Sequence, residues 1–535
     1  MPSRTRSREE IVRQDVRDLE RLGYAQQLFR EMGGFSNFAI SFSIISVLTG
    51  AVLLYGYGLK LAGPVVNSVG WPVVSVLTLC VAASMAELAS AYPTAGGLYF
   101  WAFQLGGRTW AWTTAWLNMI GQVTITAGIN VAAAIYLIGA LTRIFGLPPD
   151  TTVPVFGALT GWHFQVFVMA LLMVPQVLIN VLGIRLTARL NDLSVWWHVG
   201  GVLLIAALLA AFGRHHNPVG FLFQATAAVS PLEAASADFG GRMAPALVIG
   251  ELKLPSPLFA LVPALRDLYA AAPFALAFVL ALLQAQWTYT GYDASAHVAE
   301  ETVMARLNSA WGIFLSVAVS AVVGYVMLLI FTWCIPGGNV AKTANDAYPV
   351  LYIVYENLTV LWAHVIAVVI GGAMWLCGLA SITSMGRMWY AFARDDGMPA
   401  ARVLKRIHPV YGTPVAATLV TSALAVLICL YAAAYSVVTS ISTIALYLAY
   451  GIPIWLNLRH RGRERPPWNL GRWAKLINAV AIAWIVVISV VFVLPPNELV
   501  LWTLIAMAVG LAAYWRFGAR RHFRGPKIAG QTLRS

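Results

Sequence analysis

The chain has 535 residues, of which 59% are hydrophobic and only 11% are charged, whereas an average soluble protein is about 25% charged. This balance predicts an integral membrane protein with many spans and excludes a soluble domain with a single anchor. The net charge of +13 would suit a nucleic-acid-binding protein, but the basic residues form no stripe and no nucleic-acid-binding motif. We therefore expect the lipid bilayer, and no nucleic acid, as a partner.

The four cysteines, Cys80, Cys334, Cys377 and Cys429, lie in or beside apolar runs. Their spacing fits neither a metal site nor a disulfide framework, so we expect them to pack in the core and expect no metal or cofactor. The first 34 residues carry charges throughout and lack the apolar core of a cleavable signal peptide.

Residues 1–34 are predicted to be a cytosolic segment. The stretch DLERLGYAQQLFREMGGF, at residues 18–35, is typical of a short amphipathic helix before the membrane. Residues 1–17 fit a solvated tail at least as well as an ordered segment.

Apolar runs in residues 35–213 predict five spans, which form a first five-helix repeat. The first span contains a weak helical stretch at Ser46–Gly50, where β-branched residues and glycine come together. The third has no charge from Thr109 to Thr142, so it should be long and tilted. The five spans are expected at about 35–59, 65–86, 109–142, 163–184 and 193–213.

Residues 214–267 form a loop rich in Pro, Ser, Gly and Ala. Its apolar pieces, such as PALVIG and PLFALVPAL, are too short to cross a membrane. We expect an extracellular loop that is either a lid folded against the bundle or a plain insertion.

A second five-helix repeat is expected over residues 268–458. The uncharged run from Val410 to Leu458 would be about 73 Å long as one helix, so it must hold two spans that turn near AAAYS at 432–436. After a cytosolic loop at 459–475, two further helices fill 476–515, and 516–535 is a cytosolic tail. The later spans are expected at about 268–292, 312–335, 361–386, within 410–458 (two), 476–494 and 498–515.

Twelve spans place both ends of the chain on one side of the membrane. Of the 35 Lys and Arg residues, 28 lie on the tails and in the loops after even-numbered spans, three (Lys60, Arg143 and Lys342) lie in short loops of the other side, and four lie in the long loop. Because basic loops stay in the cytoplasm, both termini are predicted to be cytoplasmic, in the plasma membrane.

The stretch QAQWTYTGYDASAHVAEET, residues 284–302, is the most informative part of the chain. Its β-branched, aromatic and glycine residues at 288–292 are poor helix formers, and a polar face follows, made of Asp293, His297, Glu300 and Glu301. Irregular backbone at membrane depth persists only where it is buried or lines a cavity. The pattern favours a discontinuous helix at a solute site; the alternative is a continuous helix with glycine-tolerant turns.

The weak stretches in the first and sixth spans occupy equivalent positions of two halves, as expected of inverted repeats that bind a solute between them. The N-terminus of a half-helix carries partial positive charge and suits a carboxylate. Ser46, Thr49 and Gly50 suit the binding of a carboxylate at such an N-terminus. The carbonyls around Tyr289 and Thr290 could accept from an ammonium group.

Four motifs occur in order along the chain: FSNFAISFSIISVLTG, SMAELASAYPTAGGLYFWA, GYDASAHVAEET and SMGRMWYAFARDDGMP. From about Gly23 to Trp515 the chain resembles the amino acid/choline transporter family of the amino acid–polyamine–organocation (APC) superfamily. The resemblance implies an all-α membrane protein with a LeuT-like 5+5 inverted repeat, broken helices 1 and 6, and two added C-terminal helices. It also implies secondary transport of amino acids, γ-aminobutyrate (GABA) or related amines.

The resemblance also assigns site residues. Leu48–Gly50 matches the unwound segment whose amides hold the substrate carboxylate. Trp287, six residues before Asp293, resembles the tryptophan that closes over the substrate, although it could instead be a packing residue. The substrate-binding residues predicted in this way are Ser46, Thr49, Gly50, Ala51, Trp287, Tyr289, Thr290 and Gly291.

Asp293 matches a gating acid that follows the Gly–aromatic pair. It and the polar residues after it have an alternative role as anchors of the inner helix end, paired with arginines such as Arg189 or Arg387. For Glu300 and Glu301 the anchor role is favoured.

Coupling residues are implied as well. Sodium-coupled LeuT-like carriers hold an ion between the first and eighth spans, where Ser381 and Thr383 match the family's hydroxyls. Some proton-coupled relatives place a lysine of the fifth span there, and His198 matches that position. Because histidine titrates near physiological pH, proton coupling is predicted, with His198 near the carbonyls around Ser43 or the hydroxyls of Ser381 and Thr383. Sodium coupling and a purely structural histidine are the alternatives.

The predicted function is a secondary transporter, in the importing direction, of a small zwitterionic or amine solute. Choline, ethanolamine or polyamine transport and amino-acid exchange are alternatives within that class. A membrane enzyme is disfavoured because no nucleotide-binding loop, metal cluster or GxSxG motif occurs. A solute sensor is disfavoured because no signalling domain is attached. The 54-residue loop at 214–267 is longer than the family leads one to expect, and the sequence does not predict an oligomeric state.

Overall fold

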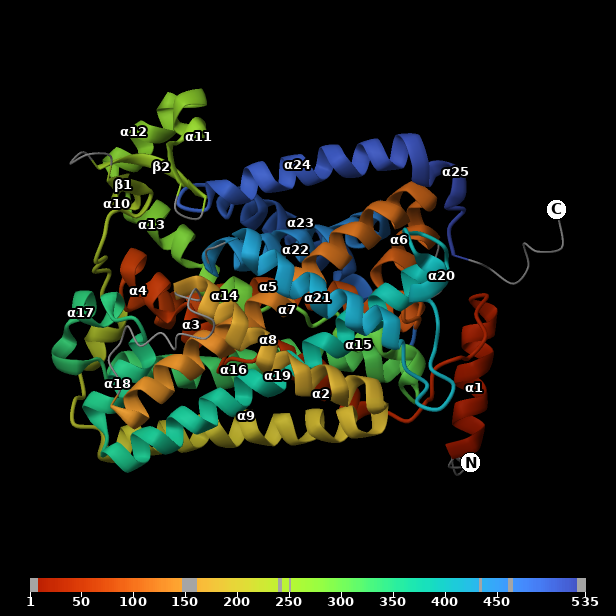
Figure 1. Ribbon diagram of the computed structural model, residues 1–535, viewed down its shortest axis with the longest axis horizontal. Helices are drawn as coiled ribbons and strands as arrows, with labels where there is room; N and C mark the ends of the chain where they lie inside the picture. Colours follow the sequence, from red (N-terminus) through yellow and green to blue (C-terminus); the bar gives the residue numbers. More distant parts are fainter. Residues whose placement is uncertain are drawn as a thin grey trace.

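The computed structural model describes residues 8–146, 161–238, 243–249, 252–432, 435–459 and 465–526. It is a bundle of long helices that run along one direction, with α1 (Arg8–Arg21) and α25 (Arg520–His522) at the same end (Figure 1). Within the described residues, ten helices are long and apolar enough to cross a membrane, and an eleventh is added if one bent pair counts as a span. The protein is therefore a multi-pass membrane protein; the count of twelve spans stays a prediction.

The first half of the bundle contains the predicted spans in the predicted order. Its helices are α2 (Gly34–Ile45), α3 (Gly50–Leu53), α4 (Tyr55–Ala62), α5 (Trp71–Ala91), α6 (Leu98–Gly106), α7 (Arg108–Phe145), α8 (Gly161–Leu182) and α9 (Ile184–Phe212). The third span is long, as predicted, since α7 has 38 residues. The fifth was predicted too short: α9 begins at Ile184, directly after Gly183, whose φ of 127° ends α8.

The second half continues in the same way. Its helices are α13 (Phe274–Ala281), α14 (Leu283–Thr288), α15 (Ala294–His297), α16 (Ala305–Trp333), α17 (Val340–Asn345), α18 (Pro349–Asn357), α19 (Val360–Arg394), α20 (Ala401–Leu404), α21 (Val415–Ala432), α22 (Tyr435–Arg459), α23 (Ala474–Val491) and α24 (Glu498–Tyr514). The turn predicted near AAAYS falls between α21 and α22, where residues 433–434 lie outside the described residues, as do 460–464 of the predicted cytosolic loop.

The predicted start of the sixth span, at Leu268, is wrong. Helix α12 (Pro263–Ala271) meets α13–α14 at 99°, because Ala272 has a φ of 45° and Pro273 follows it. Proline cannot donate the backbone hydrogen bond that a continuous helix needs there. The span therefore begins at Phe274.

The amphipathic helix predicted within residues 18–35 is also misplaced. The helix is α1, which covers much of the stretch expected to be a tail, and Gly23, with a φ of 91°, ends it. The residues from Tyr24 to Gly33 are not helical, and Met32 forms a parallel bridge with Thr302. Arg30 donates to the carbonyls of Ala299 and Thr302. These tertiary bonds, which the local sequence does not reveal, replace the expected amphipathic helix.

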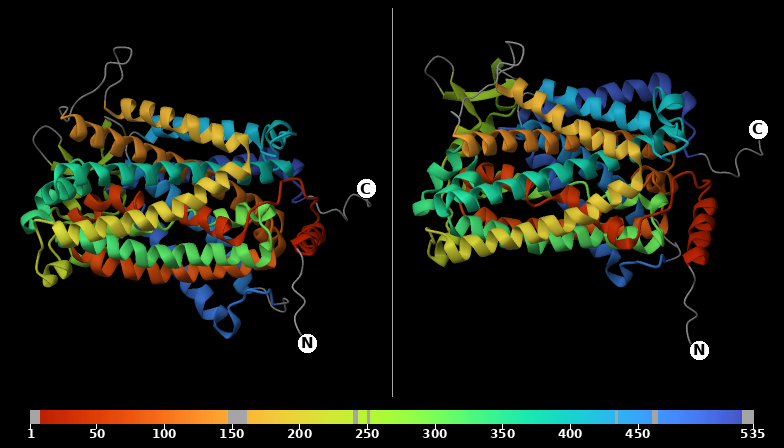
Figure 2. Two further views of the ribbon diagram at one scale, coloured as in Figure 1. Left: turned by 90° about the horizontal axis from the view of Figure 1, so that it is seen from below. Right: turned by 60° about the horizontal axis from the view of Figure 1, so that its bottom comes forward.

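The loop between α9 and α13 contains strands that the sequence did not predict. β1 (Ser236–Asp238), β2 (Met243–Ile249) and β3 (Leu252–Pro255) form an antiparallel sheet in that order. The short helices α10 (Pro231–Ala234) and α11 (Pro257–Leu261) flank it, and α12 follows. Figure 2 shows the bundle from two further directions, with the yellow-green loop at the end opposite to the termini.

Buried ion pairs hold the end of the bundle near the termini. Arg387 and Glu301 are fully buried and lie 3.1 Å apart, and Arg394 pairs with Glu300 at 2.9 Å. These pairs fit the anchor role predicted for both glutamates; Arg387 is one of the arginines named for that role, and Arg394 is a partner that the sequence did not identify. Both arginines lie on the part of α19 that runs past Gly386 into SMGRMWYAFARDDGMP, as the sequence indicated.

Replacing Arg387 by Ala should lower the free energy of unfolding by about 3–5 kcal/mol, because Glu301 would remain buried without its cation. The measurement is unfolding of the purified protein in mixed micelles by titration with dodecyl sulfate, followed by tryptophan fluorescence. Arg185→Ala is the matched control, since the Arg185 side chain is 78% exposed although it lies 2.6 Å from Glu31. It should change stability little, and equal losses in the two variants would contradict the anchor role.

Candidate functional site

The first helix break separates α2 from α3. Ser46 has a φ of 28° and ends the hydrogen-bonded run of α2. The turn that follows is closed by the amides of Thr49 and Gly50, which both donate to the Ser46 carbonyl at 2.8 and 3.1 Å. The break therefore falls at residues 46–49, within the weak stretch that the sequence indicated.

The second break separates α14 from α15, at residues 289–293. Gly291 has a φ of 82°, and a Cβ at this position would collide with the side chain of Ile44. Only glycine combines this conformation with such a close approach. The Tyr289 carbonyl accepts from the Tyr447 hydroxyl at 2.5 Å, so the open backbone is partly satisfied by a side chain of α22.

The two breaks meet in the middle of the bundle. A Cβ on Gly50 would lie 2.5 Å from Thr288 Oγ1 and 2.9 Å from Thr288 Cα, so α3 and α14 touch through backbone. A cavity of only about 10 Å³ lies between them, which is the space of about one water molecule, so the two breaks are closed against each other. Its wall is built by residues from both breaks and from α7, namely Ile44, Ile45, Thr49, Gly50, Ile125, Ile129, Trp287, Thr288 and Thr290.

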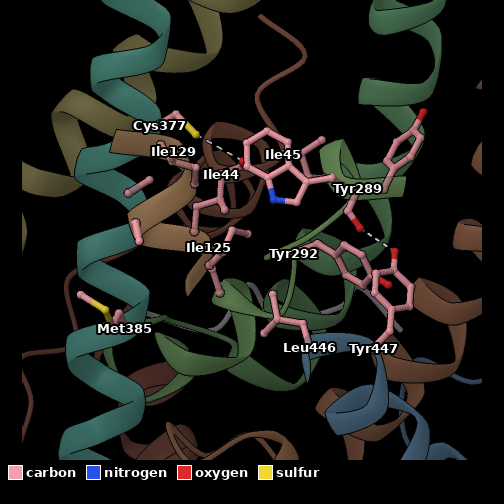
Figure 3. Close-up of a cluster of buried hydrophobic side chains, with 14 of the residues drawn as sticks. Ile44, Ile45, Ile125, Ile129, Tyr289, Tyr292, Cys377, Met385, Leu446 and Tyr447 are labelled. Atoms are coloured by element: carbon pink, nitrogen blue, oxygen red, sulfur yellow. Dashed lines mark hydrogen bonds between the residues drawn. The ribbon is translucent and has the colours of Figure 1, made fainter. Parts of the chain in front are cut away.

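Figure 3 shows the apolar part of this region. Ile44, Ile45, Ile125 and Ile129 gather near Cys377 of α19, whose thiol donates to the Ile44 carbonyl at 3.3 Å. Tyr289, Tyr292 and Tyr447 lie on the other side. No described residue that lines the cavity carries a charge.

Four of the eight residues predicted to bind substrate line the cavity: Thr49, Gly50, Trp287 and Thr290. The other four, Ser46, Ala51, Tyr289 and Gly291, are buried beside it. The sequence reasoning missed Thr288 and the four isoleucines. Nothing distinguishes Ile125 or Ile129 from the other apolar residues of a membrane helix, so no signal in the sequence could have identified them.

Trp287 has features of both predicted roles, the tryptophan that closes over a substrate and the packing residue. Its indole Nε1 donates to Ser442 Oγ at 3.1 Å, and its ring meets Tyr435 edge-on. It also lies against Gly128, where a Cβ would be 3.2 Å away. The ring is thus packed between α7 and α22 while forming part of the cavity wall.

His198 is fully buried and bonds directly to the first break. Its Nδ1 lies 2.7 Å from the Ser194 carbonyl, and its Nε2 lies 2.7 Å from Ser46 Oγ. Because a carbonyl can only accept, Nδ1 carries a proton. In the neutral ring Nε2 therefore accepts from Ser46, and Ser46 Oγ lies 2.6 Å from Thr49 Oγ1.

The expected bonds of His198 to the eighth-span hydroxyls are not formed. Ser381 instead lies 2.6 Å from Thr126 Oγ1, and Thr383 donates to Asn180 Oδ1 at 2.7 Å. His198 also does not approach the carbonyls near Ser43. Its Nδ1 is bonded to its own helix at Ser194, and its Nε2 points to Ser46, at the turn of the first break.

Asp293 is buried in a network just after the second break. Its Oδ2 accepts from Asn118 at 2.9 Å and from Gln122 and His297 at 3.0 Å. Its Oδ1 accepts from the Tyr450 hydroxyl at 2.8 Å, and that hydroxyl accepts from the Gly291 amide at 3.3 Å. Asp293 thus connects the break to α7 and α22.

Two backbone breaks around a buried cavity, inside a bundle of apolar helices, are features of a membrane transporter. The family model described as amino acid permease matches residues 32–514. The chain is 33% identical to the amino-acid permease BAT1 of Arabidopsis thaliana, with 95% of each chain covered. It is 30% identical to the BAT1 homolog of Oryza sativa subsp. japonica, over 95% of this chain and 94% of the relative. It is 26% identical to the GABA-specific permease of Saccharomyces cerevisiae, over 90% of this chain and 78% of the relative.

The chain belongs to the amino acid permease family. These relatives are permeases rather than enzymes, and the family is one of multi-pass membrane transporters for amino acids.

Gly50→Ala should reduce amino-acid uptake on the order of tenfold or more, because the new methyl group would push α3 away from the Thr288 backbone. Uptake of a labelled amino-acid mixture by cells with equal surface expression measures this. Gly200→Ala is the matched control on α9, since nothing lies within 4 Å of a Cβ there. A Gly50→Ala variant as active as Gly200→Ala would show that the contact between the breaks is not needed.

Proposed function

We propose that the protein is a secondary active transporter that moves an amino acid, GABA or a related small amine by alternating access, coupled to protons. The observation that carries this proposal is the cavity between the two helix breaks. Family membership supports an amino-acid substrate, and the yeast GABA-specific permease supports including GABA. Transport is expected in the importing direction.

Backbone groups would hold the charged ends of the substrate, because the described cavity lining has no charged side chain. The amides of Thr49 and Gly50 now donate to the Ser46 carbonyl, and a substrate carboxylate would replace that acceptor. The ammonium would bind the carbonyls of Tyr289 and Thr290. A carbonyl has two lone pairs, so Tyr447 leaves one on Tyr289 for the substrate.

The cavity wall also favours a class of side chain. Ile44, Ile45, Ile125 and Ile129 are all aliphatic, and a charged side chain placed against them would lose its water without gaining a partner. Among amino acids we therefore expect those with short apolar side chains to bind best.

The aromatic residues of the second break argue against the choline alternative. A quaternary ammonium prefers a cage of aromatic faces. Trp287, Tyr289 and Tyr292 are the aromatic residues of this segment that could form such a cage, and of these three only Trp287 lines the cavity. The Tyr289 hydroxyl bonds to Ser75 at 2.6 Å, and Tyr292 packs on Tyr450 with ring centroids 5.2 Å apart.

A methyl ester of a transported amino acid should compete poorly with the free acid, because the ester lacks the charge that the amides at Thr49 and Gly50 would bind. The measurement is inhibition of labelled amino-acid uptake into proteoliposomes by ester and acid at equal concentrations, with protein-free liposomes as the blank. Equal inhibition would contradict the carboxylate site and favour choline, ethanolamine or a polyamine as substrate.

His198 is the proposed proton site, and the hydroxyl chain from His198 to Thr49 gives it a route to the substrate. In the neutral state Ser46 donates to His198, so Thr49 donates to Ser46. A proton on Nε2 reverses this order: His198 donates to Ser46, Ser46 donates to Thr49, and the Thr49 hydroxyl becomes free to donate into the cavity. A bound carboxylate would gain that donor, so proton and substrate would each strengthen binding of the other.

His198→Gln should keep exchange of substrate across the membrane but lose accumulation driven by a pH gradient, because glutamine can bond to Ser46 without taking up a proton. The assay is proteoliposome uptake without sodium, at a series of external pH values, where wild-type uptake should rise as pH falls. His163→Gln is the matched control, since His163 is exposed at the start of α8. An unchanged pH profile in His198→Gln, or a sodium requirement in the wild type, would contradict proton coupling at this residue.

We also propose the LeuT-like topology of twelve spans, in the plasma membrane with both termini cytoplasmic. The breaks in the first and sixth spans and the shared end of α1 and α25 support it (Figure 1). The basic residues on the predicted cytoplasmic segments support the orientation. An exchanger or a solute sensor would have the same fold, and net accumulation in proteoliposomes distinguishes the transporter from both.

A further inference from the structure

The small sheet between α9 and α13 is fixed to the start of α24. Glu498, in the first turn of α24, accepts from Ser256 Oγ at 2.5 Å and from the Leu258 amide at 2.7 Å. The same carboxylate accepts from Trp502 at 3.1 Å. Figure 1 shows α11, α12 and β2 above the left end of α24, at the upper left corner of the bundle.

The strand register defines which side of this sheet faces the bundle. Leu247 of β2 is buried and Ile249 packs beside it, both against the main apolar core, and β2 contacts α24. On β3, Leu254 is paired with Leu247, and Leu252 is paired with Ile249. Paired residues of neighbouring strands project from the same face, so both leucines of β3 share the face that lies on the bundle.

β3 extends this face beyond the bundle. It is an edge strand, and Leu252 and Leu254 are 56% and 38% exposed. Met243, which shares the face by the alternation of β2, is 64% exposed. Lys253 lies between the two leucines and therefore projects to the opposite face. The edge is thus apolar on the side toward the bundle and charged on the other.

The neighbouring elements place this edge at the border of the lipid. Helix α12 lies at 99° to the span α13–α14, so it runs along the membrane surface if that span crosses the bilayer. The outward residues of α24, Ile505 and Val509, are 45% and 65% exposed, as expected of a helix that faces lipid. β2, the neighbour of β3, contacts α24, and Ser256, directly after β3, bonds to Glu498 at the start of that helix.

We propose that Met243, Leu252 and Leu254, the apolar strand face, rest on the membrane that contains the protein, in the leaflet at the end opposite α1 and α25. They would insert into the boundary between headgroups and acyl chains, where amphipathic elements bury their apolar side by about 5–10 Å. Lipid is favoured over a second protein because the face has only three exposed apolar side chains and belongs to a sheet that contacts α24, a helix with lipid-facing residues. A stable protein interface commonly buries at least about 1,000 Å².

The test compares two adjacent positions on β3. Leu252→Cys and Lys253→Cys, each labelled with the environment-sensitive fluorophore NBD, project from opposite faces of one strand. In nanodiscs, lipids with a nitroxide near the headgroup should quench the label at 252 at least about twofold more than the label at 253, because only the first reaches the interface. The native cysteines Cys334, Cys377 and Cys429 are buried, and a Cys80→Ser background removes the partly exposed fourth.

Equal quenching at the two positions would overturn the proposal, as would an aqueous emission spectrum at 252. Energy transfer between donor- and acceptor-labelled copies in nanodiscs that hold two molecules provides a further arm. Strong transfer at 252 without nitroxide quenching would assign the face to a second copy of the chain and would equally overturn the lipid assignment. The readout does not depend on transport, so its failure leaves the proposed function untouched.

Discussion

The structure depends on one constraint: backbone amides and carbonyls inside a bilayer must find partners within the protein. The first break meets it within its own turn, and the second meets it through a side chain of α22. The Ser46 carbonyl accepts from two amides of its own turn, and the Tyr289 carbonyl accepts from Tyr447. A solute with a carboxylate and an ammonium group offers the same kinds of partner, so the groups that bond within the breaks are those that the proposed substrate would use.

Polar side chains around the breaks connect the breaks to the neighbouring helices through further hydrogen bonds. His198 bonds α9 to the first break, and Asp293 joins the second break to α7 and α22. At the end near the termini, Arg387 and Arg394 of α19 bond to the glutamates after α15. These bonds tie the segments after both breaks to the surrounding helices α7, α9, α19 and α22.

Some of this could be predicted from the sequence, because the relevant chemistry is local. Glycine and β-branched residues at Ser46–Gly50 and at 288–292 located both breaks, and the apolar runs located most helices. The position of α1 and the strands of the long loop could not be predicted. They depend on partners far along the chain, such as Thr302 for Met32 and Glu498 for Ser256. His198 is buried, as its apolar run indicated. Its Nε2 bonds to the Ser46 hydroxyl and not to Ser381 or Thr383. Composition does not show which face of α19 is turned toward α9, so the sequence could not exclude those two hydroxyls.

The central claim is that the two helix breaks bind the charged ends of one solute. A cryo-electron microscopy map of the protein in nanodiscs with a saturating transported amino acid tests it most directly. We expect ligand density between the breaks, with the carboxylate within hydrogen-bonding distance of the Thr49 and Gly50 amides and the ammonium at the Tyr289 or Thr290 carbonyl. Ligand density elsewhere in the bundle, with the turn at Ser46 still closed on itself, would contradict the account.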